Sequence, residues 1–143
     1  MATFKQFEDM EAWQKARALT QAIYAISQRG PFGRDFALRD QVRRASLSIM
    51  ANIAEGLERG GTAEFIQFLA IAKGSAGEVR AHLYVALDQQ YLSQEAFNRL
   101  QGLAAETARL IGGLMSYLRT TRIRGTKFTM VSRTRNPQLT TRN

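Results

Sequence analysis

The chain contains a single histidine, His82, and its surroundings decide whether metal chemistry is open to this sequence. Glu78 stands four residues before His82, whereas the di-iron sites of helical bundles use two Glu-x-x-His pairs with additional glutamates. There is no second histidine and no cysteine to complete a zinc or iron site. We therefore expect no metal, no cofactor and a structural role for His82.

Two glycine-containing stretches have spacings that also need to be tested against known sites. Residues 56–62 have the G-x-x-x-x-G spacing of a phosphate-binding loop, but they lack its lysine and follow a helical pattern instead of a strand. Residues 74–77 do not match the G-x-S-x-G pattern of a nucleophile elbow. The end of a helix followed by a turn explains the first stretch. The second belongs to a run of small residues at 72–77, which we expect to let the third helix approach a neighbour closely. With one histidine and no candidate triad, the sequence predicts a protein that is not an enzyme.

Polar residues between positions 40 and 56 form the remaining cluster. Asp40 and Arg44 have the spacing of an ion pair on a helix, and Glu55 lies on the same strip as Arg44 three turns later, so we expect a charged network inside a subunit or between subunits. Asn52 falls on the apolar stripe, where it needs hydrogen-bond partners and is expected to set the packing register. Arg43 is a candidate nucleic-acid contact, or else the rim of an oligomer interface.

Apolar residues recur at spacings of three and four along most of the chain, which is typical of helices. Gly30 and Pro31 end the first helical pattern, and Thr62 and Ser93 are the expected N-caps of the third and fourth. The expected helices cover residues 9–28, 35–59, 63–90 and 94–122.

Four long helices with short connections predict an all-α fold, an antiparallel up-and-down four-helix bundle. We assign residues 1–122 to the bundle and residues 123–143 to a basic tail that is expected to be disordered.

The second expected helix has more apolar surface than a monomeric bundle requires. Its apolar side chains spread over about 200° of arc, whereas a surface helix needs little more than about 100°. An apolar surplus of this kind usually marks a contact, so we expect a homo-oligomer. The candidate residues for its interface or for a structural motif are Arg44, Leu47, Ser48, Met50, Asn52, Ile53, Glu55, Gly56 and Leu57.

The net charge of +8 is concentrated at one end of the chain. Residues 1–116 have a balance of +1, whereas residues 117–143 carry seven basic residues and no acidic one. Arginine binds phosphate well, so nucleic acid is the expected partner, ahead of a membrane. No apolar run is long enough for a membrane span or signal peptide, which favours a cytoplasmic protein. The candidate nucleic-acid-binding residues, besides Arg43, are Arg119, Arg122, Arg124, Lys127, Arg133, Arg135 and Arg142.

Three segments resemble one family of proteins. They are FEDMEAWQ at 7–14, DQVRRASLSIMANIAEG at 40–56 and EFIQFLAIAKGSAGE at 64–78. They are similar to the bacterial four-helix-bundle proteins first noted as products of intervening sequences in 23S ribosomal RNA genes. The resemblance covers about residues 7–120, departs from the family pattern at the first connection, residues 30–38, and does not include the basic tail.

The resemblance implies a homopentamer with no established enzymatic activity. Proteins of related fold include the accessory variability proteins of diversity-generating retroelements, which engage a reverse transcriptase and its template RNA. The motif residues are expected to shape the bundle and its interfaces, and they correspond here to Arg43, Arg44, Ser48, Asn52, Glu55 and Gly56.

These observations favour a non-catalytic, oligomeric module that binds nucleic acid, with RNA or an RNA–protein complex as the expected ligand. The alternative is a protein-interaction scaffold, or an accessory subunit of a reverse transcriptase, without RNA specificity of its own. Salt-sensitive binding to bare RNA distinguishes the two.

Overall fold

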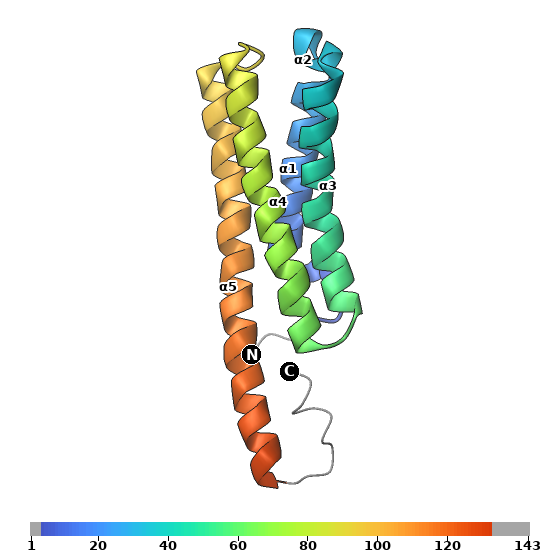
Figure 1. Ribbon diagram of the computed structural model, residues 1–143, viewed down its shortest axis with the longest axis vertical. Helices are drawn as coiled ribbons and strands as arrows, with labels where there is room; N and C mark the ends of the chain where they lie inside the picture. Colours follow the sequence, from blue (N-terminus) through green and yellow to red (C-terminus); the bar gives the residue numbers. More distant parts are fainter. Residues whose placement is uncertain (1–3, 133–143) are drawn as a thin grey trace.

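Four long helices run antiparallel to one another in the computed structural model, which describes the backbone of residues 4–132 and the side chains of residues 4–121 (Figure 1). Both α1 and α4 pack against α3 and against α5, so the helices enclose a common interior. The described residues contain helices and no strand, which confirms the predicted all-α class. The long helices are α1 (Glu11–Ser27), α3 (Phe36–Glu58), α4 (Thr62–Asp88) and α5 (Gln94–Ser132).

Two short helical elements accompany the four predicted ones. A 3-10 turn, η1 (Phe7–Asp9), precedes α1, and a short helix, α2 (Gly30–Arg34), fills the connection that we expected to be a simple break. Gly30 has a φ of +49°, and Pro31 lies in the first turn of α2, where its fixed φ suits the helix. The Gly-Pro pair therefore ends one helix and begins another.

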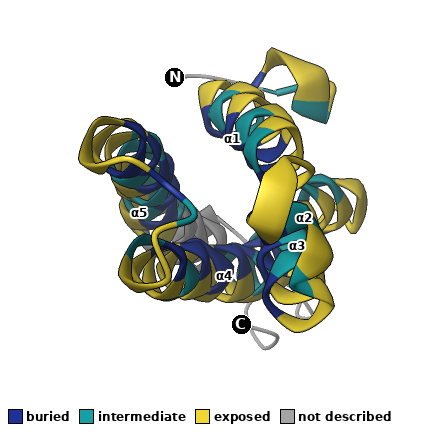
Figure 2. Cartoon of the chain, turned by 90° about the horizontal axis from the view of Figure 1, so that it is seen from above, coloured by how far each residue is buried: buried dark blue, intermediate teal, exposed yellow. Residues whose placement is uncertain are grey.

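The interior is built from the residues whose periodicity predicted the helices. Figure 2 shows buried residues on the sides of α1, α3, α4 and α5 that face one another. Burial of these apolar side chains is the main stabilising contribution to the fold. Fully buried examples, with 0% exposure, are Ile23, Ile49, Leu69, Val79 and Ile111.

Gly56 marks a close approach between α3 and α4. A Cβ atom on this residue would lie 2.8 Å from Cδ1 of Phe65 and 2.8 Å from Cβ of Phe68. The glycine thus lets the phenylalanine-bearing first turns of α4 pack directly on the α3 backbone. This explains in physical terms why a glycine closes the apolar stripe of α3.

The two predicted helix caps differ in outcome. Ser93 precedes α5 and accepts a hydrogen bond from the Ala96 backbone N–H at 3.0 Å, as predicted. The prediction for Thr62 is wrong, because Gly61 is the N-cap and Thr62 is the first residue of α4. Gly61 takes the extended cap conformation without any side-chain hydrogen bond, so the helix begins one residue earlier than expected.

The backbone of α5 is helical as far as Ser132, beyond the expected boundary at residue 122. Each added helical residue contributes one backbone hydrogen bond to a helix that is already nucleated, which favours continuation past the bundle. The remainder of the expected tail, residues 133–143, lies outside the described residues, as do all side chains after Thr121.

Candidate nucleic-acid interface

The basic C-terminal segment begins on a described part of α5. Arg119 is exposed and forms no ion pair among the described residues. The other predicted residues lie on the continuation of α5 or after it, where no side chain is described: Arg122, Arg124, Lys127, Arg133, Arg135 and Arg142.

Arg43 connects two helices. Its Nε donates a hydrogen bond to Oγ of Ser27 at 2.8 Å, and its guanidinium lies 4.5 Å from the centre of the Tyr24 ring. A cation over an aromatic ring is attracted by the ring quadrupole. Arg43 is half-buried. Because its contacts tie α3 to α1, we leave it out of the nucleic-acid surface proposed below.

Within the chain, the described residues do not form the charged network predicted along α3. Asp40 pairs with Arg39, with 3.0 Å between Oδ1 and Nε, and Glu55 pairs with Arg59 at 2.8 Å. Three helical turns separate Arg44 from Glu55 by about 16 Å, too far for a direct contact. Arg44 is exposed and has no ion pair among the described residues.

Asn52 has the hydrogen-bond partners that its position on the apolar stripe requires. Its Nδ2 donates to the backbone oxygen of Ser48 at 2.8 Å and to Oγ of Ser48 at 3.0 Å. The Ser48 hydroxyl lies 2.8 Å from the hydroxyl of Ser75 on α4. These three side chains form a polar bridge between α3 and α4.

Some of the residues predicted for an oligomer interface are buried in the interior of the bundle, and others are exposed on its surface. Ile53 and Gly56 are buried between helices of the same chain, and Met50 and Leu57 are half-buried. Leu47 points outward and is 46% exposed. Of the apolar members of the set, Leu47 therefore offers the most surface to a partner.

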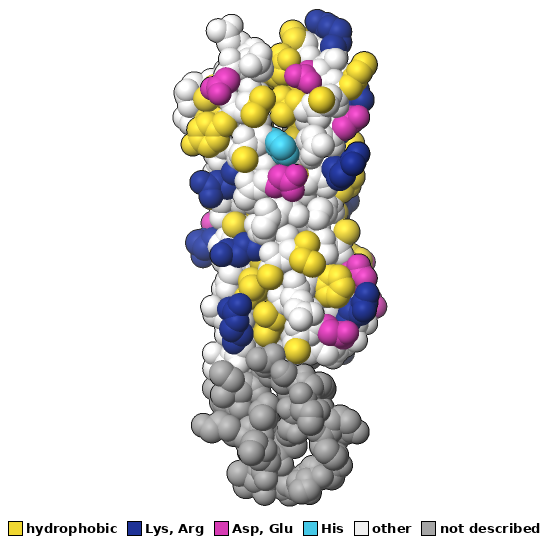
Figure 3. All heavy atoms as spheres, viewed as in Figure 1, with side chains coloured by type: hydrophobic (Ala, Val, Ile, Leu, Met, Phe, Trp, Pro, Cys, Tyr) yellow, Lys and Arg dark blue, Asp and Glu magenta, His cyan; other side chains and the backbone are white. Residues whose placement is uncertain are grey.

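A second apolar surface lies on α4 and was missed by the sequence reasoning. Ile71 and Val85 are 53% and 43% exposed, and Tyr84 is 55% exposed. Figure 3 shows hydrophobic side chains on this face above and below the histidine. The sequence could have predicted this surface, because α4 has apolar or small residues on all sides. Helices of this kind are usually buried against other parts of a protein or a partner.

An open groove of about 500 Å³ runs between α4 and α5. Lys73 and Arg80 supply the only charged side chains among the residues that line it. Sequence reasoning missed both cations. Their spacing of seven residues puts them on one face of a helix, but only the packing of α5 shows that this face borders a groove.

Two of the small residues of α4, Gly74 and Gly77, do not serve the role that we predicted for them within the chain. A Cβ atom on Gly74 or on Gly77 would have no neighbour within 4 Å, so neither glycine lets α4 approach a helix of the same chain. Both instead line the groove and keep it open.

His82 pairs with Glu78, with 3.5 Å between Nε2 and Oε2. No group of three or more potential metal ligands occurs among the described residues. The pair stands alone on the outer side of α4, so the geometry offers His82 one carboxylate and no further ligand for a metal.

The exposed pair on α5 is one example of a cation of the bundle that is paired with a carboxylate. Nη2 of Arg109 lies 2.6 Å from Oε2 of Glu106. The hydrogen bond from Arg109 lowers the pKa of Glu106 below its usual value, with a smaller contribution from the charge of the same arginine. Arg39 and Arg59 are also paired with carboxylates. Cations without a carboxylate therefore distinguish the α4–α5 groove from these sites.

No helix in the described part of the chain combines the length and apolarity needed to cross a membrane.

Comparisons with known proteins identify a similar fold and a family. A crystal structure of a protein of unknown function from the S23 ribosomal protein family of Bacteroides thetaiotaomicron has a TM-score of 0.67 to this chain. It is 23% identical in sequence, and the alignment covers 73% of this chain and 97% of that one, which shows a shared fold. No curated protein matches the chain. Residues 8–113 match the family described as 23S rRNA-intervening sequence protein. The chain therefore belongs to the 23S rRNA-intervening sequence protein family.

Proposed function

We propose that the protein is a non-catalytic, self-associating module that binds nucleic acid, with RNA as its main ligand, through the basic C-terminal part of α5 and the residues that follow it. The observation that carries the proposal is the separation of charge. The +7 of residues 117–143 is attached to a helical bundle, residues 1–116, whose own charges nearly cancel. Seven cations without an acidic residue favour a polyanion as the ligand.

The family description and the description of the similar structure support RNA as the polyanion. One refers to 23S rRNA and the other to a ribosomal protein family. Arginine makes up six of the seven basic residues, and its planar guanidinium forms paired hydrogen bonds with phosphate oxygens.

Self-association is the second part of the proposal. Leu47 on α3 and Ile71 and Val85 on α4 are large apolar side chains exposed on the outside of the bundle. Burying them against another copy would remove apolar surface from water. A homopentamer, which the family resemblance implies, would place five basic segments on one particle and raise its avidity for RNA.

RNA binding can be measured by fluorescence anisotropy with a labelled RNA stem–loop and a labelled DNA duplex across a salt series. The wild-type protein is compared with a full-length variant in which all seven basic residues from Arg119 to Arg142 are replaced by glutamine. Each neutralised phosphate contributes about 0.7–0.9 to the slope of log K against log salt, so the variant should lose up to about 5–6 units of slope.

Failure of the wild-type protein to bind either ligand at about 50 mM salt would contradict the proposal, because electrostatic binding is strong in dilute salt. The exposed apolar face of α4 would then favour the second candidate function, a scaffold for a protein partner such as a reverse transcriptase.

A further inference from the structure

The groove between α4 and α5 is a candidate for a second RNA contact, on the bundle itself instead of at the end of the chain. We infer that this groove holds the sugar–phosphate backbone of an RNA strand, with Lys73 and Arg80 as its phosphate contacts. The inference rests on the proposed function, since it names a surface for the same ligand.

Charge is the first argument. Lys73 and Arg80 are exposed at the groove, and neither pairs with a carboxylate among the described residues. None of the 12 acidic residues of the chain lines the groove. By contrast, Arg59 on the α3 side of the bundle lies next to both Glu55 and Glu64. The α4–α5 groove therefore brings together two cations that remain available to phosphate, with no carboxylate among its lining residues.

Arg80 is held in position by α5. Its Nε donates to Oε1 of Gln101 at 3.1 Å, and Nε2 of Gln101 donates to the backbone oxygen of Arg80 at 2.8 Å. This reciprocal pair fixes the side chain at the boundary between the two helices. A guanidinium that is already ordered loses less conformational entropy when it binds phosphate.

The shape of the groove admits a backbone. Its walls consist largely of small residues, and a Cβ atom on Gly74 or Gly77 would meet open space. On α5, Gly112 lies across from Lys73, with 3.5 Å between the lysine Cε and the place of a glycine Cβ. Lys73 and Arg80 are two helical turns apart, about 10 Å, so they can contact different phosphates of one strand.

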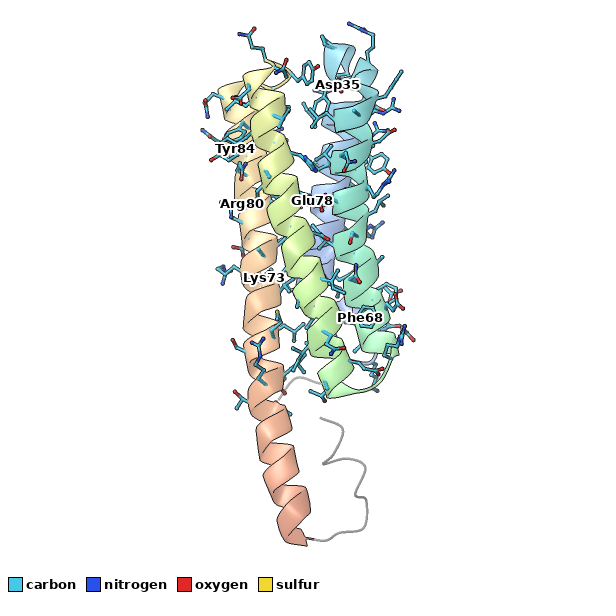
Figure 4. The ribbon with its side chains drawn as sticks, viewed as in Figure 1. Asp35, Phe68, Lys73, Glu78, Arg80 and Tyr84 are labelled. Carbon is cyan, nitrogen blue, oxygen red and sulfur yellow. The ribbon has the colours of Figure 1, made fainter. Side chains whose placement is uncertain are left out.

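Three side chains of α4 that could contact an RNA strand are arranged in a row along the helix. Figure 4 shows Tyr84, Arg80 and Lys73 in succession along the side of α4 that borders α5. Tyr84 packs edge-on against Phe97, with 4.9 Å between ring centres, and is 55% exposed. Its exposed ring offers a stacking surface to an unpaired base at one end of the groove.

The other end of the groove leads toward the basic segment. Ala108 and Met115 line the groove, and Arg119 follows at the helical spacing that keeps it on the same strip of α5. A strand that leaves the groove past Met115 therefore reaches Arg119, the first of the seven cations considered above.

The closing experiment compares two double variants of the full-length protein. Lys73→Ala with Arg80→Ala removes both groove cations, and Arg34→Ala with Arg99→Ala removes two exposed arginines that do not line the groove. Both variants change the net charge equally. Anisotropy with a labelled RNA stem–loop should show a roughly tenfold higher Kd and a salt slope lower by about 1.4–1.8 for the groove variant alone.

The outcomes separate this inference from the proposed function. If the wild-type protein binds RNA and both double variants bind equally well, the groove is not the contact and the proposed function stands. If the wild-type protein does not bind RNA, both the groove inference and the proposed function are contradicted. A groove variant that binds RNA normally but changes the mass of the assembled protein would show that the groove is filled by a second copy, and would also overturn the inference.

Gly77→Ala supplies a test that does not alter charge. Alanine favours the helix, so the variant should melt at a higher temperature, yet its methyl group narrows the groove and should raise the Kd for RNA at least threefold. Gly102→Ala, at an exposed site on α5 that does not line the groove, should raise the melting temperature without changing the Kd. An unchanged Kd for Gly77→Ala would overturn the placement of a strand in the groove.

Discussion

Gly56 shows at the scale of one residue how the bundle is held together. Replacing it by alanine would put a methyl group 2.8 Å from the side chains of Phe65 and Phe68. Overpacking of this kind costs about 1–3 kcal/mol, and the better helix propensity of alanine returns up to about 1 kcal/mol. We expect Gly56→Ala to lower the free energy of unfolding by about 1–2 kcal/mol, measured by urea denaturation.

Gly102→Ala is the matched control for this prediction. Its new methyl group would meet nothing within 4 Å, so only the helix propensity changes and stability should rise by about 0.5–1 kcal/mol. Equal stabilisation of the two variants would show that α3 and α4 are not in close contact at Gly56.

Single residues also mark the limit of what the sequence could predict. The periodic stripe indicated that Asn52 needed partners, and Ser48 supplies them from one turn earlier on the same helix. The ion pairs could not be ranked in the same way, because Arg39 competes with Arg44 for Asp40 and side-chain rotamers decide the result. The spacing of residues along a helix thus predicted which side chains are buried better than it predicted which charged side chains form ion pairs.

At the scale of elements, Tyr91 and Asp35 join two connections at one end of the bundle. The Tyr91 hydroxyl donates to Oδ2 of Asp35 at 2.9 Å, while Oδ1 of the same carboxylate accepts the Leu38 backbone N–H at the start of α3. The Tyr91 ring also stacks on Phe32 of α2, with 5.3 Å between ring centres. The connection after α4 is therefore fastened to the N-terminus of α3.

This contact predicts a dependence of stability on alkaline pH. The hydrogen bond to Asp35 raises the pKa of Tyr91 above its usual value, so the folded state holds the phenol proton more tightly than the unfolded state does. The contribution to stability is complete below about pH 10, the ordinary pKa of tyrosine, and is lost as pH rises through the raised pKa. The difference in melting temperature between wild type and Tyr91→Phe should therefore shrink above about pH 10.

Phenylalanine at position 91 keeps the ring for Phe32 and removes only the hydroxyl, so the variant isolates the hydrogen bond. A melting-temperature difference that stays constant from neutral pH to alkaline pH would show that Tyr91 and Asp35 do not interact in solution.

The long helices could be predicted because each buries one face, which repeats in the sequence every three to four residues. The short α2 could not, because a five-residue helix has too few turns to show a period and depends on Pro31 and on packing of Phe32. The groove between α4 and α5 could not be predicted from the sequence for another reason. Arg80 and Gln101 are 21 residues apart, and only the turn after α4 brings them together.

At the scale of the whole molecule, the cations proposed to contact RNA and the apolar side chains proposed for assembly lie on different surfaces. The cations considered for RNA occupy α5 and its border with α4, whereas Leu47 and Ile71 project from the outer sides of α3 and α4. A surface used for assembly can therefore be distinct from one used for RNA. The basic end of the chain was evident from composition, but this separation required the fold.

The separation predicts that assembly and RNA binding can be disrupted independently. Light scattering should give the wild-type protein a mass several times that of the 16.0 kDa chain, about 80 kDa for a pentamer. The double variant Ile71→Glu with Val85→Glu tests whether the α4 face forms the interface, and Leu47→Glu tests the α3 face. Because all three side chains are exposed, each variant should keep the helical circular dichroism spectrum of the wild type. We expect the α4 variant to lower the mass more, since it removes two large apolar contacts and buries two charges in their place. A mass near 16 kDa for the wild-type protein would exclude self-association, and a larger effect from Leu47→Glu would place the interface on α3.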